Sequence, residues 1–179
     1  FGRLPRLSYG VLPIPAGLES SANGYLPGAP EQGVAGMVVY KPWMAEKMPT
    51  FGIPAWVLHE GVPGHHHQIS LSQELTDLPE FRRADDVTAY VEGWGLYAEA
   101  LVKQYLPLNG QVGTLQLRLM REARAFLDPM VNLGLMEPAQ AEAFLVKEVG
   151  LSAPMAKQEI DRYTIRAPGQ ATAYYFGYQ

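Results

Sequence analysis

Apolar residues recur at helical spacing through most of the chain beyond residue 50. Over 114–127 they fall three and four positions apart, which is typical of an amphipathic helix. Its apolar side is predicted to carry Leu115, Leu119, Met120, Ala123 and Phe126. Caps and proline positions predict further helices over about 54–75, 85–105, 137–149, 154–165 and 168–179. We therefore expect a mainly α-helical fold.

The first forty residues follow a different pattern. Residues 1–33 are rich in proline and glycine and are predicted to form an irregular, extended arm. The segment 34–40 contains the best strand candidate, Gly36–Tyr40, which is rich in β-branched residues and ends before Lys41-Pro42. Val38–Tyr40 could pair with an extended substrate as an added strand. The sequence thus predicts one domain over 1–179, with a helical region over 54–179 and a small β edge.

Composition excludes several classes of protein. The chain has 179 residues, 47% of them hydrophobic, which is enough for one globular domain with a core. Its net charge is −4 and it has no basic patch, so a nucleic-acid partner is not expected. No apolar run reaches the ~18 residues of a membrane span. The absence of cysteine excludes disulfides and thiolate metal sites.

The chain starts at Phe1, with neither an initiator methionine nor a signal-like segment. We therefore expect it to be a piece of a longer protein, whose remaining N-terminal portion is a candidate partner. With no targeting segment to read, a cytoplasmic and an exported location both stay open.

The most informative feature is that all four histidines fall within nine residues, from His59 to His67. Imidazole is the commonest side-chain ligand of transition metals. In the zinc-binding motif H-E-x-x-H, the two histidines stand one helical turn apart and reach one metal ion. Here His59-Glu60 begins such a motif, but the second histidine position holds Pro63.

Two later histidines are candidates for the second ligand. On a straight helix His66 would lie about 10 Å further along the axis than His59, too far to share a zinc ion. Pro63 and Gly64 can distort the helix and swing His65 back toward His59. We therefore predict a bulged helix with His59 and His65 as ligands and His66 as second choice. His67 is expected beside the site or in solvent.

A third ligand must come from elsewhere, because catalytic zinc usually has three protein ligands. Glu92 and Glu99 share one face of the predicted 85–105 helix. That face lies opposite the main apolar stripe, so periodicity alone predicts that it is solvated; the stripe comprises Val87, Tyr90, Trp94, Tyr97 and Leu101. Small residues, Ala89 and Gly95, would instead let a metal-bearing helix approach closely. Helical spacing does not choose between the two glutamates.

Three motifs together resemble a bacterial family, the "domain of unknown function 885". They are His59-Glu60-x-x-Pro63-Gly64-His65-His66, Glu92-Gly93-Trp94-x-Leu96-Tyr97-x-Glu99 and Arg162-Tyr163-x(4)-Pro168-Gly169-Gln170-Ala171-x-x-Tyr174-x-x-Gly177. The resemblance covers most of the chain, and members of the family are typically longer, so it corresponds to their C-terminal part. The family is similar to gluzincin metallopeptidases, whose zinc is held by two histidines and a glutamate of the following helix.

This resemblance implies a gluzincin-like helical catalytic region in which Glu92 is the third ligand. It leaves Glu99 as a carboxylate that orients a histidine. The stretch 169–175 is also similar to the C-terminal tyrosine-rich stretch of thimet-oligopeptidase-like enzymes, where tyrosines stabilise the oxyanion. Carried over by position, the resemblance implies Tyr174 as the oxyanion donor, with Tyr163 as the alternative.

The chain departs from the family pattern after its arginine-containing helix. Asn132 stands where the family has a histidine, which would weaken or alter activity if that histidine binds substrate. The family's asparagine after its strand is not evident near Tyr40. Arg121 and Arg124 match basic positions, either as a substrate-carboxylate clamp or through an Arg124–Asp128 pair one turn apart.

These observations predict a zinc-dependent hydrolase, a metallopeptidase acting on a peptide substrate. Zn²⁺ would be held by His59, His65 and Glu92, with Glu60 as general base and Tyr174 or Tyr163 at the oxyanion. The alternative is a non-catalytic metal-binding or binding module derived from such an enzyme, which Asn132 and the missing N-terminal portion would favour.

Overall fold

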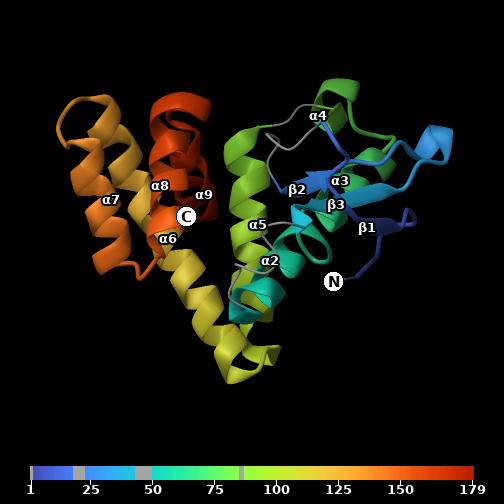
Figure 1. The fold of residues 1–179 in the computed structure, drawn as a ribbon. Helices are drawn as coiled ribbons and strands as arrows, with labels where there is room; N and C mark the ends of the chain where they lie inside the picture. Colours follow the sequence, from blue (N-terminus) through green and yellow to red (C-terminus); the bar gives the residue numbers. More distant parts are fainter. Residues whose placement is uncertain (1, 18–22, 43–49, 85–86) are drawn as a thin grey trace.

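The computed structural model describes residues 2–17, 23–42, 50–84 and 87–179. In these ranges the chain is mainly helical with one small sheet, as the sequence predicts (Figure 1). The strands are β1 (Tyr9–Pro13), β2 (Gly24–Leu26) and β3 (Gly36–Tyr40). The helices are α2 (Ile53–Glu60), α3 (His65–Glu74), α4 (Glu80–Ala84), α5 (Thr88–Val102), α6 (Leu108–Asn132), α7 (Pro138–Lys147), α8 (Ala153–Asp161) and α9 (Ala173–Tyr178).

The sheet has the strand order β1-β3-β2, with β1 parallel and β2 antiparallel to β3. The strand predicted at Gly36–Tyr40 is confirmed. The irregular arm predicted over 1–33 is wrong in part, because β1 and β2 both lie within it. Both are short and flanked by glycine and proline, and they gain their hydrogen bonds only by pairing with β3 further along the chain.

The central position of β3 also excludes one predicted use of that strand. Val38 and Val39 are paired with β1 on one side and β2 on the other, so their backbone groups cannot accept an added substrate strand. A peptide that adds to this sheet would have to pair with an outer strand.

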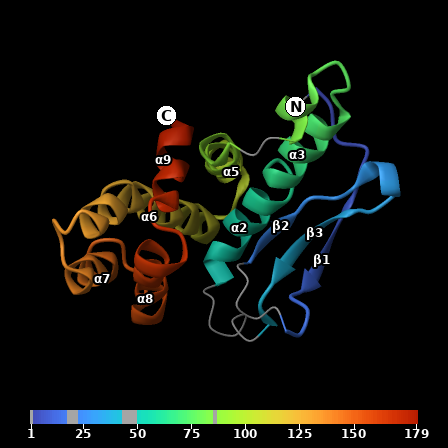
Figure 2. The same ribbon diagram turned by 90° about the horizontal axis from the view of Figure 1, so that it is seen from above.

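The molecule is built in layers (Figure 2). The sheet lies on one side of α2 and α3, and α5 lies on their other side. Next to α5 comes α9, and then α6 with α7 and α8. Glycine permits close contact between α5 and α9, since a Cβ added at Gly93 would lie under 3.0 Å from the backbone of Gly177. Helix α5 is therefore packed on two sides and forms the centre of the fold.

The exposed and buried faces of α5 are the reverse of those predicted from periodicity. Val87, Tyr90 and Tyr97 of the apolar stripe are 57%, 63% and 44% exposed, whereas Glu99 on the opposite face is 1% exposed. The face with small residues and glutamates is the one that packs against α2 and α9. The prediction failed because buried partners compensate the glutamate charge, which a hydrophobicity pattern does not register.

Helix α6 buries only part of its predicted apolar side, since Met120 and Ala123 are buried as predicted but the other three residues are not. It is longer than the predicted 114–127, and Leu115, Leu119 and Phe126 of its predicted apolar side are 49%, 43% and 40% exposed. Its buried face instead combines apolar and charged side chains, namely Met120, Arg121, Ala123, Arg124, Leu127 and Asp128. This charged part of α6 faces the centre of the molecule, where it contributes ion pairs to the site described below.

The C-terminal half has its own hydrophobic cluster. Buried side chains of α6, α7, α8 and the π-helical segment Arg162–Arg166 pack together there, including the fully buried Leu127, Leu145 and Tyr163. The predicted start of α7 is confirmed, because Glu137 caps that helix and Pro138 is its first residue. The helix predicted to begin at Pro168 starts later, with a 3₁₀ turn over Gln170–Thr172 that leads into α9.

Two other predicted helices differ in detail. The predicted 54–75 helix is divided into α2 and α3. The helix predicted from Asp85-Asp86 to Tyr105 corresponds to α5 and a 3₁₀ turn at Lys103–Tyr105, and its predicted cap lies outside the described residues. None of the helices in the described ranges is both long and apolar enough to cross a membrane.

The contact between Gly93 and Gly177 generates a test of the fold. Gly93→Ala should destabilise the protein by about 1–3 kcal/mol, because its methyl group would overlap the α9 backbone. Gly52→Ala is the matched control, since an added Cβ there meets nothing within 4 Å. Thermal unfolding of both variants checks this, and equal melting temperatures would contradict the packing of α5 on α9.

Candidate metal centre

The two candidate histidine ligands lie on helices joined by a sharp turn. Helix α2 ends at Glu60 and α3 begins at His65, so the predicted bulged helix is wrong: the chain leaves the helical path completely. A Cβ added at Gly64 would lie under 3.0 Å from the backbone of His59, and glycine permits this approach. The turn brings the rings of His59 and His65 to a centroid distance of 4.6 Å, at 83° to one another.

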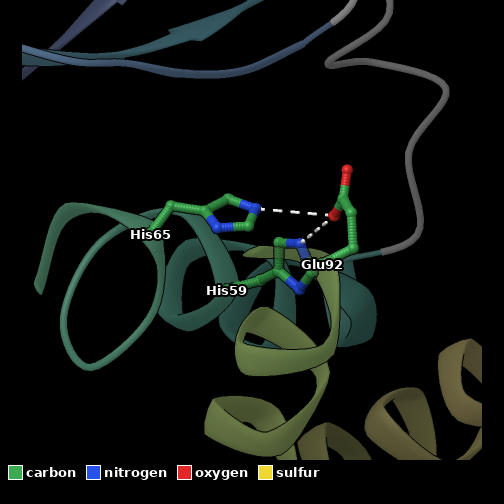
Figure 3. A group of neighbouring side chains, drawn as sticks. All are labelled: His59, His65 and Glu92. Carbon is green, nitrogen blue, oxygen red and sulfur yellow. Dashed lines mark ion pairs between the residues drawn. The ribbon is translucent and has the colours of Figure 1, made fainter. Parts of the chain in front are cut away.

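Glu92 of α5 faces both histidines (Figure 3). Its Oε2 lies 3.5 Å from Nε2 of His59 and 3.6 Å from Nε2 of His65. One donor atom from each of the three residues lies within 4.8 Å of the others, as a metal site requires. A Cβ added at Gly95 would lie 2.5 Å from Cε1 of His59, so the missing side chain lets α5 come this close to α2.

Glu99 holds His59 from its other ring nitrogen. Oε1 of Glu99 lies 2.8 Å from Nδ1 of His59 and accepts a hydrogen bond from Nη2 of Arg121 at 3.0 Å. Because a carboxylate only accepts, Nδ1 of His59 must carry a proton, which leaves Nε2, on the side of Glu92, as the nitrogen that could bind a metal ion. The structure thus brings Glu92 into the cluster and places Glu99 behind it, as the family resemblance implies.

The other two histidines lie elsewhere on α3. His66 donates from Nε2 to the carbonyl of Leu7 at 3.0 Å, and its Nδ1 lies 2.9 Å from the hydroxyl of Tyr25. Both its nitrogens are therefore engaged with the N-terminal part of the chain, which leaves His65 as the histidine that joins His59. His67 is 3% exposed, so it is buried and does not lie in solvent.

The charges of the cluster are strongly coupled. Burial lowers the pKa of His59, but the carboxylates of Glu92 and Glu99 outweigh this effect and raise it to about 9. Burial raises the pKa of Glu92, yet His59 and His65 outweigh it and hold that pKa well below its usual range. Without a metal ion, a proton on His59 therefore balances the carboxylates, and a cation bound there would take its place.

Glu60, the predicted general base, is also buried beside this cluster. Burial raises its pKa, and the opposing effects of His59 and His65 are smaller. Its Oε2 accepts no hydrogen bond from the described residues, and a Cβ added at Gly24 of β2 would lie 3.9 Å from it. A carboxylate with an unused oxygen and a raised pKa is suited to accept and return a proton.

The two tyrosines predicted at the oxyanion lie in different places. The ring of Tyr174 stacks over His59 at a centroid distance of 6.3 Å, and its hydroxyl accepts a hydrogen bond from Arg162 at 2.9 Å. Tyr163 is fully buried in the hydrophobic cluster, and its hydroxyl donates to Glu159. The structure therefore brings Tyr174 to the three candidate ligands and holds the hydroxyl of Tyr163 on Glu159.

The arginines of α6 are engaged in buried ion pairs. Arg124 donates two hydrogen bonds of 2.6 Å to Glu159, rather than pairing with Asp128 as its spacing suggested. Arg121 pairs with Glu99. Asn132, where the family has a histidine, donates to the Asp128 carboxylate and to the carbonyl of Tyr163 at 3.1 Å. Asn132 therefore joins α6 to the π-helical segment Arg162–Arg166, which contains Tyr163.

Gln170 belongs to the third sequence motif, but the sequence predicts no role for it. In the structure its amide nitrogen lies 3.3 Å from Oε1 of Glu92 and donates to it. Gly169, just before it, has a φ of +81°, a left-handed conformation that favours glycine. In the sequence, Gly169 alone indicated a sharp turn immediately before Gln170.

Comparisons with known proteins concern the family and the fold of the chain. The model of a bacterial family of unknown function, DUF885, matches residues 1–179. A crystal structure described as the "putative lipoprotein from Colwellia psychrerythraea" is 29% identical, with a TM-score of 0.90 over 99% of this chain and 31% of that one. A "putative lipoprotein of unknown function from Shewanella oneidensis" shares the fold at 19% identity and a TM-score of 0.64, over 96% of this chain and 32% of that one. No curated protein matches. The chain thus spans about a third of the length of these two relatives.

The raised pKa of His59 predicts a pH dependence for the metal-free protein. Protonated His59 contributes its full stabilisation of the fold below pH 6.5, the ordinary pKa of a histidine. This contribution is lost as pH rises through about 9, the raised pKa of His59. Across this interval the free energy of unfolding should fall by about 1–3 kcal/mol. In Glu92→Gln, which removes one paired carboxylate, the fall should be smaller.

Urea unfolding at a series of pH values, in the presence of a chelator, measures this dependence. Glu122→Gln is the control, because Glu122 pairs with Arg118 at the surface of α6. An unchanged pH dependence in Glu92→Gln would refute the charge coupling described for His59.

Proposed function

Because this chain belongs to the DUF885 family of bacterial proteins and converges His59, His65 and Glu92 on one point, we propose that it is the catalytic region of a zinc-dependent metallopeptidase. The observation that carries the proposal is the cluster of two imidazoles and one carboxylate with a buried, unused carboxylate, Glu60, directly beside it. The activity of the longer proteins to which such a chain belongs is part of the same proposal.

The donor set fits zinc. Zinc in hydrolases is commonly held by two histidines and a glutamate, at distances that place neighbouring donors about 3.3–3.4 Å apart in a tetrahedron. The 3.5 Å and 3.6 Å separations between Glu92 and the histidines are close to that value. Oε2 of Glu92 accepts no hydrogen bond from the described residues, and Glu99 fixes the tautomer of His59. Both features suit metal ligation.

Bound zinc would supply a Lewis acid that polarises a carbonyl group and acidifies a nearby water molecule. The chain's own part in hydrolysis falls to Glu60 and Tyr174. Glu60 takes a proton from the attacking water and returns it to the leaving amine, for which its raised pKa is suited. Tyr174, whose ring stacks over His59, donates a hydrogen bond from its hydroxyl to the oxyanion that forms on the substrate.

A peptide is the favoured substrate because of the resemblance to gluzincin enzymes, which is an argument by analogy. The sheet supplies a physical argument as well. Strand β2 is the outer strand that passes beside Glu60, so an extended peptide that pairs with it would reach the site. Val38–Tyr40, on the central strand, has no such role.

Metal analysis tests the first part of the proposal. We expect about one zinc ion per chain in the wild type, and its loss in His65→Ala and in Glu92→Ala, because each removes a ligand. Glu122→Ala, at the surface, should keep the metal. Elemental analysis of folded protein purified without chelator is the measurement. A wild type that binds no zinc would favour the alternative of a binding module without catalytic metal.

Replacement of the proposed base tests catalysis. Glu60→Gln should lower kcat by about 10²–10⁴ on a peptide that the wild type cleaves, since general-base catalysis contributes about that much. Zinc content should stay unchanged, because Glu60 is not a ligand in this proposal. Peptide-library cleavage followed by steady-state kinetics measures the effect, and wild-type turnover in Glu60→Gln would reject the mechanism.

A further inference from the structure

We propose that Gln170 and Arg162 are positioning residues that link the ligand Glu92 to the oxyanion donor Tyr174, so that the two are set as one unit. This inference rests on the proposed function. It gives a positioning role to Gln170 and Arg162, which are not among the predicted ligands and catalytic residues.

Gln170 divides the two oxygens of Glu92 between separate tasks. Oε2 of Glu92 faces His59 and His65, while Oε1 accepts the hydrogen bond from the amide nitrogen of Gln170 at 3.3 Å. The amide oxygen of Gln170 accepts a hydrogen bond from Nη2 of Arg162. A primary amide is suited to this place because it donates on one side and accepts on the other, which a carboxylate cannot do.

The backbone on each side of Gln170 is held by one buried carboxylate. Asp128, which is fully buried on α6, accepts from the amide of Gly169 at 2.9 Å and from that of Ala171 at 3.3 Å. Asn132 donates to the same carboxylate at 2.7 Å. Gln170 is therefore presented by a turn with little freedom. Such support is expected for a residue that must hold a ligand in place.

Arg162 completes the link and sets the direction of the last hydrogen bond. Its Nη2 also donates to the hydroxyl oxygen of Tyr174 at 2.9 Å. A guanidinium only donates, so Tyr174 is the acceptor here and its own proton is left for another oxygen. No described residue takes that proton in a hydrogen bond of the structure. The Tyr174 hydroxyl is thus prepared to donate to a substrate oxygen.

Charge distinguishes Arg162 from the two other arginines around the Tyr174 ring. The guanidinium carbons of Arg121, Arg124 and Arg162 lie 5.7, 4.8 and 5.4 Å from the ring centroid. Arg121 pairs with Glu99 and Arg124 with Glu159. Among the described residues, no carboxylate forms an ion pair with Arg162, and Glu159, whose pKa the charge of Arg162 helps to lower, is already paired with Arg124. The positive charge of Arg162 is therefore available to strengthen the Tyr174 hydroxyl as a donor.

The link itself is tested in the metal-free protein, without reference to activity. The side-chain amide NMR signal of Gln170 should shift in Glu92→Ala and in Arg162→Met, because each removes one of its partners. Arg166→Met is the matched control, since Arg166 is an exposed arginine at the end of the same π-helical segment, Arg162–Arg166. A Gln170 signal that stays in place in both test variants overturns the proposal.

The coupling is tested by a double-mutant cycle on peptide hydrolysis. Arg162→Met should lower kcat by about 10–100-fold with KM changed less than about threefold, and Tyr174→Phe should lower kcat by about 10²–10³-fold. If Arg162 acts through the Tyr174 hydroxyl, the double variant should be no slower than Tyr174→Phe. Arg162→Lys, which keeps a charged donor, should recover part of the loss, and Arg166→Met should match the wild type.

Additive effects of Arg162→Met and Tyr174→Phe would overturn the proposal. A wild type that binds zinc but cleaves no peptide would instead overturn the proposed function alone, because the NMR comparison tests the link independently of turnover.

Discussion

The arrangement of the site depends on the absence of side chains at two positions of α5. Gly93 faces α9, where an added Cβ would overlap the backbone of Gly177, and Gly95 faces α2, where it would meet the ring of His59. Because α5 can approach both neighbours, Glu92 lies between the histidines of one side and the Tyr174 helix of the other. Larger residues here would separate the groups that the site combines.

The close packing of α5 and α6 buries charged side chains, which would strongly destabilise the fold if they had no partners of opposite charge. Glu99 is 1% exposed but contacts His59 and Arg121, and Arg124 is 5% exposed with both hydrogen bonds directed to Glu159. Buried ion pairs of this kind add little net stability, yet removal of one partner costs about 3–5 kcal/mol because it leaves a buried charge. They fix geometry: each constrains a side chain that touches the site.

The sequence predicted the site better than it predicted the packing around it. Residue type and spacing indicated His59 and His65 as candidate ligands although Pro63 interrupts the usual motif, whereas the choice of Glu92 over Glu99 came from the family resemblance. The buried face of α5 was predicted on the wrong side and that of α6 was predicted only in part, because hydrophobic periodicity assigns Glu99 and Arg121 to solvent. The strands β1 and β2 were missed since they depend on pairing with β3, which local sequence does not encode. The position of Gln170 was not predicted, because it depends on hydrogen bonds from the neighbouring backbone to Asp128, which lies 42 positions earlier in the chain.

The position of Tyr174 in the last helix has a consequence for biosynthesis. The three candidate ligands all lie within the first 92 residues, whereas the ring that stacks over His59 comes some 80 positions later. At ~5–20 residues per second, a ribosome adds that stretch in roughly 4–16 s. During this time the nascent chain contains all three candidate ligands but lacks the helix whose tyrosine stacks over His59. The candidate ligands are thus synthesised before α9, and Tyr174 joins them only when α9 docks on α5.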